Sequence, residues 1–182
     1  MKNIGFILLI VLISGCASNK PPAGPVYTGP IEQKENMATV YIFRGLAFAG
    51  SLRDVNVFIN GSAEHVLSNG SYIATYLSPG EYEFGIKNVP GWQYKEGPYI
   101  HLKYSIEPGN SYYVGYFKAF DVAGTPEEEF FQKSSKQEIN TGLLEVGLLD
   151  IDHILGVIKE EHALRELEKL KLSRMVVNPE KI

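Results

Sequence analysis

A chain of 182 residues with 45% hydrophobic and 21% charged side chains can bury the core of one domain, and a mean hydropathy of −0.07 excludes a polytopic membrane protein. Asp and Glu outnumber Lys and Arg by 21 to 17, and the net charge of −4 argues against a nucleic-acid-binding protein. The single cysteine excludes an intrachain disulfide framework, so that a zinc site would depend on four scattered histidines and the acids.

The first fifteen residues have the layout of a secretory signal peptide. Lys2 supplies the positive charge, and an almost unbroken apolar stretch follows over 4–13. A stable membrane span needs about 20 apolar residues, so we expect this segment to be removed rather than to remain as an anchor.

The next feature is a cysteine preceded by small and aliphatic residues, Leu12-Ile13-Ser14-Gly15-Cys16. This segment resembles the lipobox of bacterial lipoproteins, which implies cleavage between Gly15 and Cys16 and attachment of lipid to the Cys16 thiol. No Asp follows Cys16, and in bacteria with two membranes that pattern implies the outer membrane, on its periplasmic side. The alternative is an ordinary cleaved signal that leaves a free cysteine, or a signal anchor that is kept.

Residues 18–36 contain four prolines and little hydrophobicity, a composition that is typical of a flexible linker. With the lipidated N-terminus they form a predicted tether over 16–36. A tether of this kind would hold a folded domain clear of the lipid headgroups.

Beyond Met37 the hydrophobic pattern has a period of two, which is typical of half-buried strands. Apolar and polar residues alternate over 54–59, 81–87 and 100–107, and β-branched and aromatic runs cover 38–44 and 110–120. Turn dipeptides separate these segments: Asn60-Gly61, Asn69-Gly70, Pro79-Gly80 and Pro108-Gly109. We interpret both Asn-Gly pairs as type I′ hairpin turns rather than glycosylation sites. The pattern predicts a mainly β protein, an antiparallel β-sandwich with a C-terminal α-helix.

The last third of the chain shows helical signals. A proline followed by acids predicts a short helical turn around 127–132. After Lys159 the period becomes helical, with Ala163, Leu164, Leu167 and Leu170 on one face and with Lys169, Lys171 and Arg174 near the end. Residues 142–158 fit either two strands or a backward extension of this helix, which three glycines would weaken.

Four stretches, at 38–44, 57–61, 70–82 and 159–167, resemble the bacterial lipoproteins of family DUF2846, whose role is uncharacterised. The segment Leu77-Ser78-Pro79-Gly80-Glu81-Tyr82 is also similar to PEGA-like and carboxypeptidase-regulatory-like β-sandwiches. The resemblance implies a β-sandwich with a closing helix and a location in the cell envelope. With the signal peptide over 1–15 and the tether over 16–36, the expected domain covers 37–174 and a tail covers 175–182. The resemblance carries over no catalytic residue.

No constellation in the sequence points to a reaction. The histidines lack metal-ligand spacing, and there is no nucleophile elbow or phosphate-binding loop. We therefore expect no enzymatic activity, no cofactor and no metal. The remaining candidates are Trp92, Tyr94 and Tyr99, in a loop bounded by Gly and Pro, where flat rings would suit contact with a ligand or partner. The alternative is that Trp92 folds back as a lid over an edge of the sandwich.

These observations predict a lipid-anchored envelope protein whose domain is a non-enzymatic structural or binding module. Its expected partners are the membrane, through the N-terminal lipid, and a cell-wall glycan or an envelope protein, with no nucleic acid. An alternative is a glycan- or peptidoglycan-binding lipoprotein that uses the Trp92 loop. A hydrolase of unfamiliar design is the third hypothesis.

Overall fold

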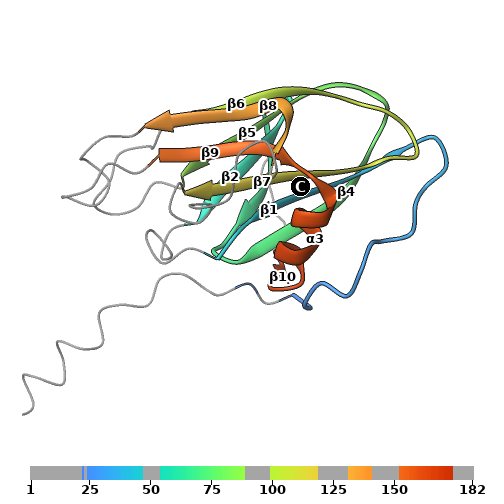
Figure 1. Ribbon diagram of the computed structural model, residues 1–182, viewed down its shortest axis with the longest axis horizontal. Coiled ribbons are helices and arrows are strands. Elements are labelled where there is room, and N and C mark those ends of the chain that lie inside the picture. Colours follow the sequence, from blue (N-terminus) through green and yellow to red (C-terminus); the bar gives the residue numbers. More distant parts are fainter. Residues whose placement is uncertain are drawn as a thin grey trace, which may run out of the picture.

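The described part of the chain folds into two β-sheets that lie face to face, with the helix α3 (Glu160–Leu167) packed on the outside of one sheet (Figure 1). The computed structural model describes residues 22, 24–46, 54–88, 99–118, 131–140 and 152–173. The predicted mainly β fold, an antiparallel β-sandwich with a C-terminal helix, is confirmed. Within these ranges no helix is long and apolar enough to cross a membrane.

The large sheet, as far as the described residues show it, has the strand order β10-β4-β1-β7-β9-β8. Its strands are β1 (Ala38–Arg44), β4 (Ser71–Leu77), β7 (Ser111–Lys118), β8 (Phe131–Asn140), β9 (Asp152–Ile158) and β10 (Lys171–Leu172). Most neighbours are antiparallel. The exceptions are β1, which runs parallel to β7, and β10, which runs parallel to β4. The strand β1, between β4 and β7, is buried at every residue.

The small sheet has the order β3-β2-β5-β6 and is antiparallel throughout its described strands. Its strands are β2 (Val55–Ile59), β3 (Ser62–Leu67), β5 (Gly80–Asn88) and β6 (Tyr99–Ile106). Strand β3 contacts β4 at one edge of the sandwich, and β6 contacts β8 and β9 at the other. Because β1, β4 and β7 belong to the large sheet and the strands between them to the small sheet, the chain crosses between the sheets several times.

The main hydrophobic core lies between the sheets. On β6, Ile100 and Leu102 are buried whereas His101 is exposed, as a period of two requires. Val57 on β2 and Phe84 on β5 are 0% and 1% exposed. These burials confirm the predicted phase of the alternating strands.

The two Asn-Gly turns differ from each other. Asn60 and Gly61 have φ angles of 51° and 78° and join β2 to β3, which confirms a hairpin of the predicted kind. Asn69 and Gly70 instead connect β3 of the small sheet to β4 of the large sheet, and only Gly70 has a positive φ, 68°. The hairpin prediction is wrong there, because this turn carries the chain from one sheet to the other.

The outer face of the large sheet is covered by α3 and by the N-terminal segment. Ala163, Leu167 and Leu170 are fully buried against it, which confirms the predicted apolar face of the helix. The helix ends at Leu167, and Lys171 already belongs to β10, so the predicted continuation toward residue 174 is wrong. An amphipathic stripe of this kind needs a covering surface, because a short helix is marginal by itself.

Residues 24–34 are bound to the domain and are not a free coil. The backbone of Gly24 donates to Leu172 (3.2 Å), Leu172 donates to Pro25 (2.9 Å), and Tyr27 donates to Leu170 (3.1 Å). The Ile31 amide donates to the hydroxyl of Tyr41 over 2.8 Å. The prediction of a flexible tether over 16–36 is therefore wrong for this part, because Tyr27 and these hydrogen bonds offset the entropy of ordering it. Residues 16–21 and 23 lie outside the described residues.

On the C-terminal side one prediction fails and one pair of alternatives is decided in part. Phe131 and Gln132, expected to end a helical turn, begin β8, while the rest of that turn lies outside the described residues. Residues 152–158 form β9, which is paired with β7 and β8, so of the two alternatives for 142–158 the strand is confirmed there and the helical extension is excluded there. The pairing on both sides overrides the helical spacing of its leucines and isoleucines. Residues 142–151 lie outside the described residues.

Candidate functional site

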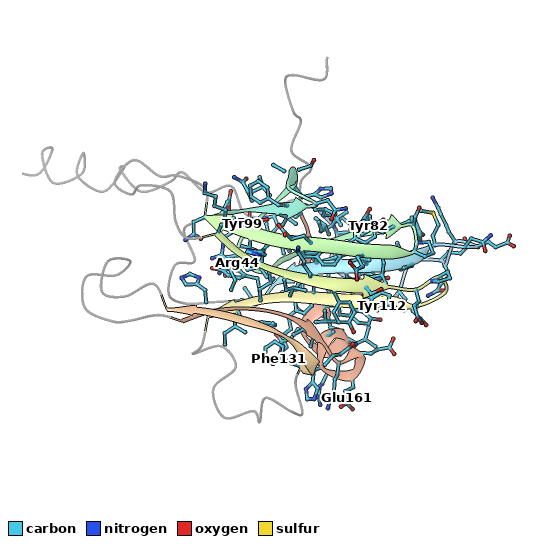
Figure 2. All side chains as sticks on the ribbon, turned by 90° about the horizontal axis from the view of Figure 1, so that it is seen from above. Arg44, Tyr82, Tyr99, Tyr112, Phe131 and Glu161 are labelled. Carbon is cyan, nitrogen blue, oxygen red and sulfur yellow. The ribbon has the colours of Figure 1, made fainter. Side chains whose placement is uncertain are left out.

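Tyr99 is the one predicted contact residue that the structure describes. Trp92 and Tyr94, like Gly15 and Cys16, lie outside the described residues. Tyr99 begins β6, and its odd-numbered phase places it on the outer face of the small sheet, away from the core that takes Ile100 and Leu102. In Figure 2 it lies on the upper sheet of the sandwich, at the opposite end from Tyr82. No described helix or strand covers this face.

An aromatic cluster forms around Tyr99 and consists of Phe58, Tyr99 and His101. The rings of Tyr99 and His101 stack, with centroids 5.1 Å apart and an angle of 19°, whereas Phe58 meets Tyr99 edge-on at 5.5 Å and 87°. His101 is exposed, as the alternation predicts, and the other two are half-buried. Phe58 lies on β2, and Tyr99 and His101 lie on β6. The sheet brings them together because β5 lies between these two strands and pairs with both.

Gly85 makes room for the cluster. It is paired with Phe58 on one side and His101 on the other, so it occupies the central position of the row. A Cβ atom there would lie 2.2 Å from the Tyr99 hydroxyl oxygen and 2.5 Å from two of its ring carbons. The Tyr99 ring therefore lies directly over the glycine, a close approach that any larger residue would prevent.

The hydroxyl of Tyr99 is held by a carboxylate. It donates a hydrogen bond to Oε1 of Glu83 over 3.1 Å. Burial raises the pKa of Tyr99, and the bond to Glu83 and the charge of that carboxylate raise it further. At physiological pH the hydroxyl therefore keeps the proton that it donates to Glu83.

A polar hollow adjoins the cluster at Glu83. It is an open depression of about 390 Å³, lined by Asn60, Gly61, Glu81, Tyr82, Glu83 and Lys103. The hairpin turn shapes its wall, because the Asn60 amide donates to the carbonyl of Glu83 (2.8 Å) and Oδ1 of Asn60 accepts from the Glu83 amide (2.9 Å). Lys103 is paired with Glu83 across the strands. Carboxylates and an ammonium group thus stand next to flat rings.

A second hollow, of about 400 Å³, lies at the turn between β6 and β7. Its lining is mostly polar: Gln33, Gly109, Asn110, Ser111, Tyr112, Gln132 and Glu160. The side chain of Gln33 donates to Ser111 Oγ over 3.2 Å, so the N-terminal segment forms part of its wall. With one aromatic ring in its lining, it offers less surface for stacking than the aromatic cluster does.

Sequence reasoning missed a set of polar side chains inside the sandwich. Tyr116 and His153 are each 2% exposed, and a hydrogen bond joins the Tyr116 hydroxyl to Nδ1 of His153. The guanidinium of Arg44, which is 3% exposed, lies 6.0 Å from the centre of the Tyr116 ring. The sequence did contain a signal for the burial of Arg44, because this residue continues the inward-facing positions of Val40 and Ile42 along the strand.

Among the described residues, no group of three or more His, Cys, Asp or Glu side chains is close enough together to bind a metal ion. The arrangement on the small sheet is instead suited to non-covalent contact. Its rings can stack on a flat ligand, and its carboxylates and ammonium group can accept and donate hydrogen bonds.

Comparison with protein-family models gives no match, and comparisons with curated proteins and with solved structures give none either. The resemblance to DUF2846 lipoproteins therefore stays a prediction. The functional argument depends on the geometry of the chain itself.

Proposed function

We propose that this protein is a lipid-anchored component of the bacterial cell envelope whose β-sandwich is a non-enzymatic binding domain. The observation that carries the proposal is the aromatic cluster, which lies on the outer face of the small sheet beside a polar hollow. Aromatic rings that the chain leaves partly exposed are typical of contact sites, since burying the rest of their surface against a ligand or partner is favourable. The lipobox at Cys16 supports the anchor and the location.

The anchor is tested by replacing the cysteine. Cells that express the full chain are grown with a fatty-acid analogue, and the wild-type protein should take up the label and fractionate with membranes. Cys16→Ser should remove the label and leave unprocessed precursor, because the acceptor thiol is gone. A Cys16→Ser variant that still takes up label would contradict lipidation at this residue.

A glycan, with peptidoglycan as the nearest example in the envelope, is the second candidate for the ligand. The specific observation in its favour is that Tyr99 and His101 supply flat rings, while Glu83 and Lys103 supply an acceptor and a donor beside them. Sugar rings have apolar faces and a rim of hydroxyl groups, so they match such a surface.

The glycan candidate is tested by co-sedimentation of the full chain, in mild detergent, with purified cell-wall sacculi. The double variant Tyr99→Ala, His101→Ala should lose most of the sedimented fraction. Ser105→Ala is the matched control, because it is exposed on the same face and outside both the cluster and the hollow. No sedimentation of the wild-type chain at high concentration would exclude this ligand and leave a protein partner at the same face.

A further inference from the structure

The N-terminal segment fixes where the anchored end of the chain leaves the domain. From Gly24 onward it is hydrogen-bonded to the strand β10, and Val26 is paired with Lys171. Figure 1 shows this segment in blue, passing β10 before it turns toward β1. The anchored chain therefore enters at one edge of the large sheet, next to β4 and β10.

The chain between the anchor and this edge is short. Eight residue steps separate Cys16 from Gly24, and a fully extended chain covers about 29 Å over that distance. A domain of this size is roughly 38 Å across. The predicted tether of 16–36 would have allowed the domain to rotate freely, whereas the bound segment leaves too little chain to turn the far side toward the lipid.

Exposed apolar side chains gather at the same edge. Val26 and Leu46 are 46% and 59% exposed and are two of the three large apolar residues that stand out on the described surface. The side chain of Leu46 lies against Gly70, since a Cβ atom on that glycine would be 2.6 Å from it. The carbonyl of Gly70 accepts from the amide of Lys171 over 3.2 Å, which brings the two apolar residues to opposite sides of Lys171.

Basic side chains accompany them. Lys171 is exposed, and Lys169, just before β10, has an exposed side chain that also bonds to Glu166. Apolar groups flanked by lysines match the interface of a bilayer, where the apolar groups enter the headgroup region and the ammonium groups meet lipid phosphates. We call Val26, Leu46, Lys169 and Lys171 the tether edge.

We infer that the tether edge rests on the lipid surface that holds Cys16, so that the domain has a fixed orientation and the opposite edge of the sandwich, with β6, points away from the membrane. Two independent observations agree: the bound segment, which fixes where the chain enters and how short the connection is, and the apolar and basic groups at that point. The inference depends on the proposed lipidation of Cys16. Beyond the covalent attachment at Cys16, the inference gives the folded domain a direct, non-covalent contact with the lipid surface.

Fluorescence quenching by lipid tests this orientation in the full chain. Cys16 is the only cysteine and is blocked when acylated, so a second one can be labelled selectively with an environment-sensitive dye. Leu46→Cys places the dye on the tether edge, and Val26→Cys is a second reporter there. Ser105→Cys is the control, because β6 is at the opposite edge of the sandwich and Ser105 is exposed on its outer face.

The purified lipoproteins are placed in phosphatidylethanolamine and phosphatidylglycerol vesicles that contain a spin-labelled lipid. We expect quenching at residues 46 and 26 to exceed that at residue 105 at least about threefold, and Lys171→Glu to reduce it. Equal quenching at the three positions, in protein that carries fatty acid, would overturn the orientation and leave the anchor intact. If the wild-type chain carries no fatty acid, the proposed function and this inference both fail.

Discussion

The two outer faces of the sandwich differ in whether other segments of the chain cover them. On the large sheet, α3 and the N-terminal segment cover a second apolar cluster that is as fully buried as the main core. On the small sheet, no described element covers the aromatic cluster of Phe58, Tyr99 and His101. The covered face holds more aromatic rings than the open one, but both faces carry them, so the presence of rings does not by itself distinguish a structural face from a binding face. What distinguishes them is whether the chain itself supplies the cover.

Tyrosine illustrates the contrast. On the covered face, the rings of Tyr41 and Tyr113 stack at 5.3 Å, and Tyr27 meets Tyr41 and Tyr72 edge-on at 6.0 and 5.6 Å. These four rings are buried and hold the N-terminal segment in place. On the open face Tyr99 packs over a glycine and remains half-exposed.

The largest effect should come from removing the cover of the large sheet. Truncation before Glu160 deletes the buried side chains of Ala163, Leu167 and Leu170, and we expect a loss of about 5 kcal/mol, comparable to the whole stability of a typical domain. Thermal melting should show a much lower Tm, or aggregation. Glu161→Ala is the control, since its partner on the helix surface is His162 and its side chain is 72% exposed. A truncated chain that melts as high as the full chain would refute the covering role.

The N-terminal segment should contribute through one side chain. Tyr27→Ala leaves a cavity beside the rings of Tyr41 and Tyr72, and we expect a loss of about 3 kcal/mol in the free energy of unfolding. Tyr27→Phe keeps the packed ring and should change stability little at neutral pH. Denaturant unfolding measures both. If both variants behave like the wild type, the segment is not held by this residue.

Alkaline pH should loosen the covered face. Desolvation by burial, followed by the neighbouring Tyr41, raises the pKa of Tyr27 to about 12. Desolvation also raises the pKa of Tyr113, and its hydrogen bond to Glu160 raises it further. In the unfolded chain these hydroxyls lose their protons near pH 10, whereas the folded state retains them. Stability is therefore complete below pH 10 and falls as the pH rises through 12, on the order of 2–3 kcal/mol for Tyr27. The Tyr27→Phe variant should lose less stability than the wild type between pH 10 and pH 12, as thermal melting would show. If both lose the same amount, groups other than Tyr27 cause the loss.

The smallest effect on stability should occur on the open face. Gly85→Ala places a Cβ atom where the end of the Tyr99 ring lies, and this flexible side chain can move aside, so we expect a cost of about 1 kcal/mol or less. The cluster itself should be disrupted, which NMR would detect as a shift of the His101 ring signals. Unchanged His101 signals would show that Gly85 does not position the cluster.

The strands that could be predicted are those with one face buried. Residues 54–59, 81–87 and 100–107 alternate because the small sheet has a core face and an open face. The strand β8 has the sequence FQKSSKQEIN and shows no such pattern, since pairing with β9 at the edge of the sheet forms it. Residues 24–34 have the composition of a linker, and a single buried tyrosine with a few hydrogen bonds is too weak a signal to reveal that they are bound.

The candidate site was predicted in part. Tyr99 was singled out, and the outward phase of His101 followed from the alternation of β6. Phe58 and Gly85 were missed because their relation to Tyr99 depends on the register between β2, β5 and β6, which spacing along one strand does not determine. A glycine in an otherwise regular strand was the available signal, since it often marks a close approach.

Photo-crosslinking in intact cells tests most directly whether the open face is the one that binds. A photoreactive amino acid is introduced at Ser105, exposed on the small sheet, and separately at Glu161, exposed on the helix that covers the large sheet. The account predicts high-mass adducts from residue 105 and few from residue 161. Adducts from residue 161 together with none from residue 105 would contradict it.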